Sequence, residues 1–476
     1  MGMRIKRPTR DDSRKIVPSG LNLDSLSITA TRLAAGGYEM SFADLDALTR
    51  FFRSVGVTRL VCKALAENDN SKQQIYLGGS FEVLQLLPHR SIRTESLGKR
   101  PNFKAALDFS WIDDAGQTAI AHHAQLILYP DYPEVRLSGF LLGCPVAPSK
   151  AMQPVPKDER KHFNDSDGRV LFFGVTADDK IFAYLAKAGS LISIEFAARL
   201  GAGAFRQDGV FLHVPLGGAI DTRAELLSKL REIHHAGWHV SKRLDRDGRI
   251  IAYQAQNGGG FTLEALLGVR PNAKAAPDYL GWEIKAYGSG KVTLMTPEPD
   301  SGYYGTHGVK AFVRKYGHDA GNDVLYFTGI HRVNEPCAKS GQILRLRGFD
   351  HLKRKIVDVG GGIELVDNRG EVSAAWTFEG LIDHWSRKHA AAAYVPYEKK
   401  AGAPPEYQYT SPVLLGEETE FPLYLAALHS GKVFYDPASK VMRASTANSS
   451  VKARSQFRMT IANLALLYKK FEAIEL

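Results

Sequence analysis

A change of hydrophobic pattern near residue 221 most strongly constrains how this chain can fold. Before residue 221, short segments of alternating or β-branched apolar residues follow one another, separated by glycine, proline and asparagine. After it, amphipathic helical segments alternate with strand-like ones. The first pattern predicts a small β-barrel, and the second predicts an α/β domain around a central mixed sheet. Since 476 residues exceed what one core usually organises, we expect two domains, residues 1–200 and 201–476.

The elements expected in the N-terminal half are short and mostly extended. A basic, polar arm over the first forty residues leads into a helix near 42–55, and a proline-rich, charged loop is expected at 145–167. The segment 168–186 is typical of a hairpin. Further strands are expected at 58–65, 73–79, 105–114, 124–130 and 134–143.

The C-terminal half opens with two amphipathic helices, at 222–237 and 261–268, and Gly268 fits a helix C-cap. Later helices are expected at 378–391 and 422–428, and the chain ends on the segment 463–475. The strands expected between them are 281–287, 291–296, 323–330, 342–349 and 361–367.

The composition restricts partners and compartment. Lysine and arginine outnumber aspartate and glutamate by ten, which favours a polyanionic partner such as nucleic acid or an anionic membrane surface. No apolar run reaches the roughly 18 residues of a membrane helix, and the N-terminus lacks the apolar core of a signal peptide. We therefore expect a cytoplasmic protein with no membrane partner. Cys62, Cys144 and Cys337 are far apart, which argues against disulfides and structural zinc.

The segment 258–302 contains the residues that indicate chemistry. Glu283 and Lys285 are two apart on a predicted strand, so their side chains project from the same face. Asp278 precedes Glu283 by five positions, an odd separation that points it the other way on an unbroken strand. A bend at Gly281 would restore convergence.

These residue types suit phosphodiester hydrolysis. The reaction needs a divalent metal held by hard oxygen ligands, which Asp278 and Glu283 would supply. Lys285 would orient or help to deprotonate the attacking water and stabilise the charge that develops on the phosphate. Glu264, on a helix expected to pack on this strand, would complete the carboxylate set. A lone Glu-x-Lys is most often a solvent-facing charge pair, but the longer pattern in a basic chain favours a nuclease.

The ordered series of segments resembles the MvaI/BcnI family of restriction endonucleases, whose core is the PD-(D/E)xK nuclease fold. The resemblance runs from about residue 221 to the end of the chain. The segments that carry it are GWHVSKR (237–243), FTLEALLG (261–268), PDYLGWEIK (277–285), TLMTPEP (293–299), AAWTFEGLIDHW (374–385) and SQFRM (455–459).

The resemblance implies roles for the residues singled out above. It places the family's metal-binding aspartate on Asp278, its second acidic ligand on Glu283 and its catalytic lysine on Lys285. Glu264 is similar to the first acidic residue of the related mismatch-repair nicking endonuclease, which stands the same fourteen positions before the aspartate. The resemblance also implies Mg²⁺ as cofactor, replaceable by Mn²⁺, and double-stranded DNA as substrate.

The family further implies a monomer with one catalytic centre that nicks the two strands in turn at a short, nearly palindromic, GC-rich site. A cognate DNA methyltransferase is then expected in the host, although not as a stable subunit. Arg332 and Arg458 are expected to reach base edges in the major groove together with His331. Arg458 suits a phosphate or a surface carboxylate as well, and His331 suits a place in the core. The residues expected to hold the DNA backbone are His239, Lys242 and Arg243.

The N-terminal half resembles the DNA-binding effector domain of EcoRII, a β-pseudobarrel also found in plant transcription factors, through KALAENDNSKQQIYLGG (63–79). The resemblance implies that two loops grip the major groove, the second near 132–139. An Asn-Asp-Asn-Ser run is also an ordinary turn, so a turn without DNA contacts stays an alternative. The residues suited to bases and phosphates are Asn68, Asn70, Lys72, Gln74, Glu134 and Arg136.

We therefore expect a type II restriction endonuclease of phage defence, with an N-terminal effector or target-recognition domain and a metal-dependent nuclease domain. Two alternatives stay open. One is a nicking or modification-dependent endonuclease in repair or phage defence. The other is a DNA-binding regulator whose carboxylates are structural.

Overall fold

The computed structural model describes residues 42–97, 100–132, 134–160, 166–217, 221–255, 257–270 and 277–476. These described residues belong to one compact unit. No helix of the described residues is long and apolar enough to cross a membrane. The basic arm expected over the first forty residues lies outside the described part of the chain.

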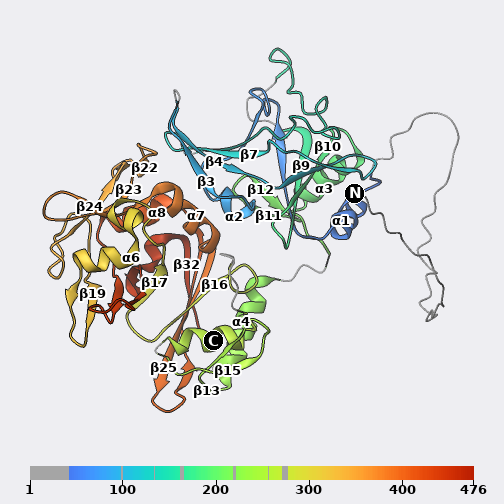
Figure 1. Ribbon diagram of the computed structural model, residues 1–476. Helices are drawn as coiled ribbons and strands as arrows, with labels where there is room; N and C mark the ends of the chain where they lie inside the picture. Colours follow the sequence, from blue (N-terminus) through green and yellow to red (C-terminus); the bar gives the residue numbers. More distant parts are fainter. Residues whose placement is uncertain are drawn as a thin grey trace, which may run out of the picture. The chain divides into compact units, whose positions relative to one another are not determined.

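Two β-sheets form the described part of the N-terminal region (Figure 1). The strands of the seven-stranded sheet are, in spatial order, β11 (Arg206–Asp208), β12 (Phe211–His213), β1 (Val57–Ala66), β9 (Ser166–Thr176), β10 (Ile181–Ala186), β5 (Phe109–Ile112) and β6 (Thr118–Ile120). Those of the five-stranded sheet are β2 (Gln74–Gly78), β8 (Glu134–Ser138), β7 (Gln125–Tyr129), β4 (Asn102–Ala106) and β3 (Ile92–Glu95).

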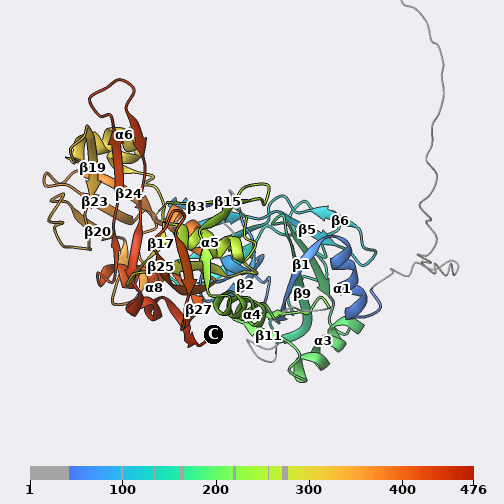
Figure 2. The ribbon, with the colours of Figure 1, turned by 90° about the horizontal axis from the view of Figure 1, so that it is seen from below.

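Both faces of the seven-stranded sheet pack against apolar cores. Because side chains alternate along a strand, neighbouring residues of its central strands enter different cores. Val61 faces a core that includes residues of the five-stranded sheet, whereas Leu60 faces α1 (Leu45–Ser54) and α3 (Leu191–Gly201). Figure 2 shows both helices beside β1 and β9. Asp44 is the N-cap of α1, since its side chain accepts a hydrogen bond from the backbone N–H of Ala47 in the first turn.

The C-terminal region is built around a mixed central sheet. Its strands are, in order, β13 (Trp238–Val240), β26 (Glu406–Tyr409), β25 (Ala391–Lys400), β27 (Val413–Thr419) and β32 (Tyr468–Ile474), with β16 (Glu283–Tyr287) parallel to β25. Smaller sheets are formed by β17 (Lys291–Met295), β31 (Phe457–Thr460) and β28 (Val433–Tyr435), by β18 (His318–Asp319), β19 (Val324–Thr328), β29 (Ala438–Met442) and β30 (Ser450–Lys452), and by β20 (Ile343–Arg347), β23 (Gly362–Val366) and β24 (Val372–Thr377). Two ribbons pair β14 (Lys242–Leu244) with β15 (Ile250–Ala252) and β21 (Phe349–Asp350) with β22 (Lys355–Ile356).

Two helices cover one face of the central sheet. Ile284 pairs with Ala393 of β25, which pairs with Leu415 of β27, so the three side chains share a face. They pack in one core with α4 (Thr222–His235) and α5 (Gly258–Leu266). The alternate residues of β16, including the predicted catalytic ones, point to the opposite face.

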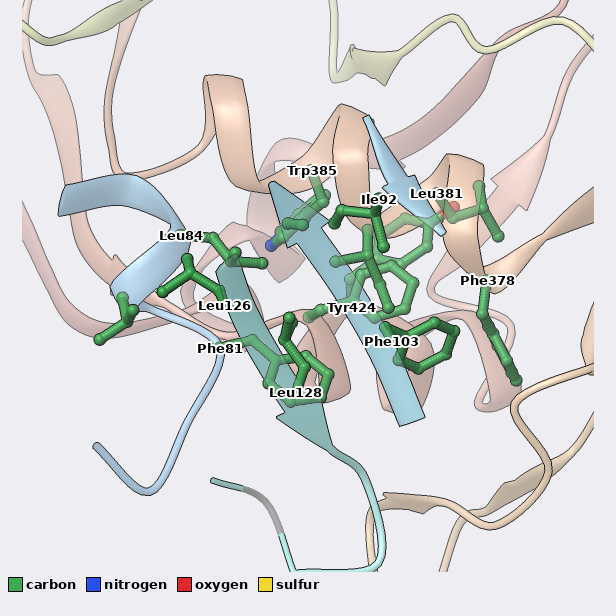
Figure 3. Close-up of a cluster of buried hydrophobic side chains, with 14 of the residues drawn as sticks. Phe81, Leu84, Ile92, Phe103, Leu126, Leu128, Phe378, Leu381, Trp385 and Tyr424 are labelled. Carbon is green, nitrogen blue, oxygen red and sulfur yellow. The ribbon is translucent and has the colours of Figure 1, made fainter. Parts of the chain in front are cut away.

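An apolar core joins the N-terminal five-stranded sheet to two helices of the C-terminal region, α7 (Phe378–Lys388) and α8 (Phe421–His429). A polar contact accompanies it, in which the Glu379 carboxylate accepts a hydrogen bond of 2.6 Å from the backbone of Thr94. Separating these elements would expose the core to water, at a cost in free energy proportional to its area. The side chains in contact include Phe81, Leu84, Ile92, Phe103, Leu126, Leu128, Phe378, Leu381, Trp385 and Tyr424 (Figure 3).

The mixed α/β class and most of the expected elements are confirmed. The hairpin expected at 168–186 is β9 and β10, and the helices expected at 222–237 and 261–268 are α4 and α5. The helices α2 (Val83–Leu86) and α3 and the strands β3, β4 and β6 were not expected. Most strands of the C-terminal region were not expected either, including β13, β25, β26 and β27 of the central sheet. The segment 463–475 forms a 3₁₀ turn, η1 (Ile461–Leu467), followed by β32.

The structure differs from the expected elements in two further places, a glycine-rich helix and the edge of the first sheet. The helix α6 (Gly302–Tyr316) was not expected because its sequence is rich in glycine, and Gly308 has a non-helical φ of 77° inside it. Strand β12 pairs with β1 and β11 pairs with β12, so the first sheet continues to His213. The division of the chain near residue 200 stays a prediction.

Candidate active site

A tight turn precedes β16, the strand that carries the predicted catalytic residues. Tyr279 and Trp282 exchange backbone hydrogen bonds of 3.0 and 2.8 Å across it. Between them, Leu280 and Gly281 have positive φ angles of 50° and 88°, as in the two-residue turns that reverse a hairpin. The structure therefore has the bend that the odd separation of the acidic residues requires.

The turn brings three predicted residues together. The Asp278 Oδ2 atom accepts a hydrogen bond of 2.9 Å from the backbone N–H of Ile284. The Lys285 ammonium donates to Glu283 Oε1 at 2.8 Å. Asp278 is thus anchored between the two charged residues of β16, although it lies before the turn.

The ion pair on β16 is shielded from water. Its side chains are 4% exposed at Glu283 and 16% exposed at Lys285. Burial lowers the pKa of Lys285, but the charge of Glu283 and the hydrogen bond to it raise the pKa further, so that it lies above its usual value. Lys285 therefore carries a proton at neutral pH. An exposed pair of this kind would be screened by solvent, whereas this one acts at close range in a dry environment.

The fourth predicted residue, Glu264, lies in the last turn of α5. The helix sits close to the sheet because Gly258 and Gly259 have no side chains: an added Cβ would lie 2.5 Å from the Tyr407 hydroxyl and 2.6 Å from the Tyr397 ring, respectively. Among the described residues, no group of three or more His, Cys, Asp or Glu is arranged to hold a metal ion. The structure therefore does not bring Glu264 into one group with the two carboxylates beside β16.

The three residues expected to hold the DNA backbone are partly engaged within the protein. His239 is hydrogen-bonded at 2.9 Å to the carbonyl of Ile233 in α4. The Arg243 guanidinium lies 5.4 Å from the centre of the Tyr253 ring. Lys242 is tied to α5 through its backbone only, so its half-exposed side chain can still reach a partner.

His331 does not fit the expected contact with a base edge. It has no exposed surface, its Nε2 lies 2.8 Å from the Ser340 hydroxyl, and its ring stacks on Phe327 at a centroid distance of 5.6 Å. Burial raises the pKa of Cys337, but hydrogen bonds from His331 and Ser340 reverse the shift and lower it to about 6. In this structure His331 is a core residue, the alternative that its sequence position left open.

The arginines expected in the major groove are half-exposed. Arg332 lies 5.3 Å from the centre of the Phe434 ring, so its planar group is held by stacking. Arg458 donates to the Asp436 carboxylate at 2.8 Å. Arg458 therefore makes the carboxylate contact that was one of its two expected partners, and its contact with bases stays a prediction.

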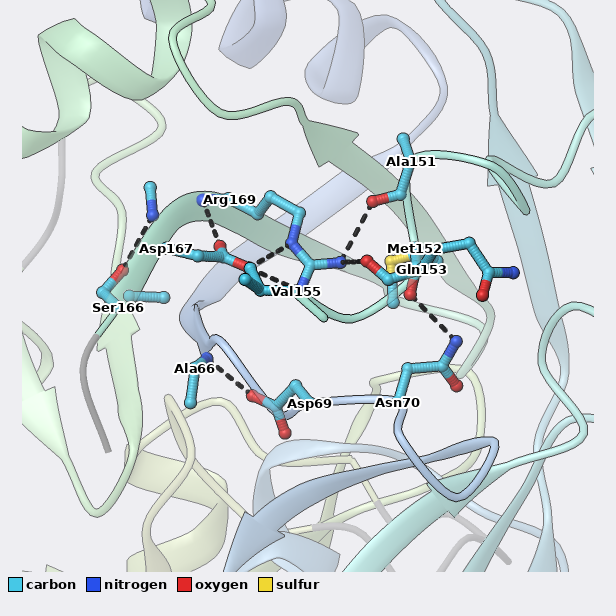
Figure 4. A network of polar contacts seen from close by, with 12 residues as sticks. Ala66, Asp69, Asn70, Ala151, Met152, Gln153, Val155, Ser166, Asp167 and Arg169 are labelled. Carbon is cyan, nitrogen blue, oxygen red and sulfur yellow. Dashed lines mark hydrogen bonds and ion pairs between the residues drawn. The ribbon is translucent and has the colours of Figure 1, made fainter. Parts of the chain in front are cut away.

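The loop between β1 and β2, expected to touch DNA, is held from inside (Figure 4). The Asp69 carboxylate pairs with Lys63 and accepts a hydrogen bond of 2.9 Å from the Ala66 backbone. Asn70 has a positive φ of 66° and donates from its side chain to the Met152 carbonyl at 3.0 Å. Asn70 is thus buried in a structural contact instead of presenting its amide to a base.

The proline-rich segment at 145–160 packs under the same loop. Arg169 donates to the carbonyls of Ala151 and Gln153, both at 3.0 Å (Figure 4). The backbone of Val155 donates to the Glu67 carbonyl at 3.0 Å. Sequence reasoning missed this supporting role, since a proline-rich, charged segment is typical of a solvated connector. Asn68 is half-buried, and the exposed residues at the tip of the loop are Ser71, Lys72 and Gln73.

The remaining predicted contacts lie on one face of the five-stranded sheet. Arg136 donates through Nε and Nη2 to the two carboxylate oxygens of Glu134, both at 3.0 Å. Gln74 lies beside this pair, with its side-chain nitrogen 3.5 Å from the Tyr129 hydroxyl. The geometry leaves these half-exposed groups in reach of a partner, and their contact with DNA stays a prediction.

Comparison with known proteins gives one family model and several solved structures. The family model of the MvaI/BcnI restriction endonuclease family matches residues 227–468. A solved complex of restriction endonuclease MvaI with cognate DNA is 19% identical and covers 54% of this chain and 99% of its own, with a TM-score of 0.42. MvaI without DNA is 16% identical over the same shares, with a TM-score of 0.31. The B3 domain of UbaLAI restriction endonuclease with cognate DNA is 18% identical and covers 35% of this chain and 96% of its own, with a TM-score of 0.21.

No curated protein matches the chain. The range matched by the family model contains the turn at 279–282, β16, α5 and the central strands β13, β25, β26 and β27, and it ends at the first residue of β32. The C-terminal region is therefore of the restriction-endonuclease class. With about half of its residues matched, the chain belongs to the MvaI/BcnI restriction endonuclease family.

Proposed function

We propose that this protein is a type II restriction endonuclease that hydrolyses double-stranded DNA at a short, GC-rich site with Mg²⁺ as cofactor. The observation that supports the proposal most is the turn at 279–282, which brings Asp278 beside Glu283 and Lys285. In this proposal the C-terminal region has the PD-(D/E)xK arrangement, and the N-terminal region is a DNA-binding pseudobarrel.

The donor set fits Mg²⁺. Asp278 and Glu283 offer carboxylate oxygens, the ligands that this hard cation prefers. Mg²⁺ keeps several water molecules and is often bound by only one or two carboxylates, so a pair of acidic residues suffices. Mn²⁺ favours the same oxygen ligands and is expected to substitute.

The residues divide the work of cleavage between them. When bound, Mg²⁺ would lower the pKa of the attacking water and neutralise charge on the phosphate. Asp278 is oriented by the Ile284 N–H, which holds its carboxylate against the backbone of β16 between Glu283 and Lys285. Lys285 holds a positive charge 2.8 Å from Glu283, where it would orient the water and stabilise the charge that develops in the transition state.

The N-terminal region would bind a copy of the target and act as an effector or a target reader. The exposed tip of the β1–β2 loop supports this role, since Ser71, Lys72 and Gln73 offer hydrogen-bonding groups and one positive charge. An effector predicts that a plasmid with one target is cut slowly and that added specific oligonucleotide accelerates it. Equal rates with and without oligonucleotide would remove the effector role.

The decisive experiment is to incubate the purified protein with unmodified phage DNA and Mg²⁺ and to sequence the ends. A recurring short sequence at both ends is expected, with cleavage lost in Asp278→Asn or after chelation of the metal. Breaks at random positions, or breaks that persist in Asp278→Asn, would contradict the proposal. Protein that nicks one strand only, or that cuts only modified DNA, would instead support a nicking or modification-dependent endonuclease.

A DNA-binding protein without catalysis is the second candidate. One observation favours it: the Glu283 carboxylate, a proposed metal ligand, is already paired with Lys285 at 2.8 Å. This candidate predicts specific DNA binding that is unchanged in Glu283→Gln and no cleavage by the wild type with either Mg²⁺ or Mn²⁺.

A further inference from the structure

Two buried tyrosines lie on the face of the central sheet that carries the predicted catalytic pair, Glu283 and Lys285. Glu283 pairs with Ala392 of β25, and Ala392 pairs with Gly416 of β27. In the next row Lys285 pairs with Tyr394. Because cross-strand partners project from the same face, the Tyr394 side chain stands next to that of Lys285.

The second tyrosine, Tyr468, reaches Tyr394 across a strand. Tyr468 belongs to β32, which is separated from β25 by β27, yet the two phenol oxygens are 2.7 Å apart. Gly416 makes this approach possible, because an added Cβ there would lie 2.5 Å from the Tyr468 ring. The Tyr468 ring therefore lies over Gly416, in the row that begins with Glu283 and continues through Ala392.

The pair is an unfavourable choice for a core that needs packing alone. Tyr394 is 0% exposed and Tyr468 is 6% exposed, so both hydroxyls are withdrawn from water. Phenylalanine would fill the same space without that cost. Burial raises the pKa of Tyr394 to about 12, although the bond to Tyr468 and the charge of Lys285 lower it, so the phenol stays protonated. A protonated pair places polar groups where hydrocarbon would otherwise face two charges.

We propose that Tyr394 and Tyr468 are positioning residues of the reaction centre, whose hydrogen-bonded phenols form a fixed polar support that holds Lys285 against Glu283. Neither tyrosine touches the substrate in this proposal. They act through the ion pair, since the support limits where the lysine ammonium can move. The inference rests on the proposed nuclease function.

The test uses variants that keep the rings. Tyr394→Phe and Tyr468→Phe each remove one partner of the same hydrogen bond. Each is expected to lower the single-turnover rate of cleavage with Mg²⁺ about tenfold, because small displacements of catalytic groups reduce rates strongly. DNA affinity measured without divalent cation should stay within about twofold of wild type. The double variant should be no slower than the slower single variant, since both lose one shared interaction.

Three further variants, a test and two controls, separate positioning from stability. Tyr184→Phe removes another buried phenol, which donates to Asp114 at 2.9 Å in the N-terminal region, and should lower the thermal midpoint without changing the cleavage rate. Gly416→Ala keeps both hydroxyls but pushes on the Tyr468 ring, and should slow cleavage. Gly290→Ala adds a methyl group where nothing lies within 4 Å and should cut at the wild-type rate.

The outcomes distinguish the two proposals. Wild-type protein that cleaves no DNA overturns the nuclease function and this inference with it. If wild type cleaves, but both phenylalanine variants cleave equally fast and lose only stability, the tyrosines are structural. Rate losses that add in the double variant would also overturn the inference, because they would mean that the two phenols act separately.

Discussion

The strand β16 and the loop between β1 and β2 differ in how their polar side chains are used. On β16, Glu283 and Lys285 bond to each other, and Asp278 joins them through one backbone hydrogen bond. In the loop, the Asp69 and Asn70 side chains hydrogen-bond to the backbone, and neighbouring residues form the exposed tip. Both segments carry several polar or charged side chains within a few residues, so their sequences look equally suited to a site.

The difference teaches that geometry and exposure are determined at different levels. The alternation of a strand and a tight turn decide over a few residues whether charged groups converge. Whether a polar side chain faces a partner depends on what packs behind it, which for Asn70 is the distant Met152 carbonyl. His331 shows the same effect, since its backbone pairs with the distant Tyr435, whose ring centre lies 5.6 Å from its own.

The largest expected effect tests the convergence on β16. Lys285→Met and Glu283→Gln should each lower the plasmid cleavage rate about 10²–10³-fold or more, because they remove preorganised charge from the reaction centre. Lys470→Met and Glu418→Gln alter an exposed ion pair on β32 and β27 of the same sheet and should leave the rate unchanged. Equal cleavage by all four variants would make the pair on β16 a structural one.

The next effect concerns His331 as a core residue. His331→Ala should lower the free energy of unfolding by about 2–4 kcal/mol, because it removes a buried ring and a hydrogen bond. Urea denaturation followed by tryptophan fluorescence measures the change. If His331→Ala has wild-type stability but binds DNA more weakly, the predicted contact of His331 with a base edge would be supported instead.

A smaller effect is expected in the turn at 279–282. Gly281→Ala should destabilise the protein by about 1–2 kcal/mol, because Gly281 has a φ of 88° that a side chain disfavours. The added Cβ would meet nothing within 4 Å, so the cost is conformational. Leu280→Asn should act in the opposite direction, since asparagine tolerates positive φ better than leucine. Thermal unfolding of the two variants side by side decides whether backbone strain is the cause.

The smallest effect on stability belongs to the loop tip. Lys72→Ala should change the free energy of unfolding by less than about 0.5 kcal/mol while reducing the slope of log affinity against log salt by about one. Asn70→Ala should lower the free energy of unfolding and leave the salt slope unchanged, because its amide supports the loop backbone. Titrations of DNA at several salt concentrations measure the slope. An unchanged slope in Lys72→Ala would remove this residue from the contacts with DNA.

The sequence by itself determined the α/β class, most of the helices, some of the strands, and the residues beside the turn before β16. These features follow from periods of two and 3.6 residues and from glycine placement, all of which act over short stretches of chain. Residue types and spacing also carried the family resemblance, which the family model confirms over residues 227–468.

Only the tertiary structure decided which polar groups are buried and which elements pack together. It placed His331 and Asn70 inside the protein, paired β12 with β1, and brought Tyr468 over Gly416 to Tyr394. Each of these contacts joins residues that are distant in sequence or whose surroundings come from distant strands. Local sequence patterns do not predict such contacts, because the burial of a side chain depends on the packing of the whole chain.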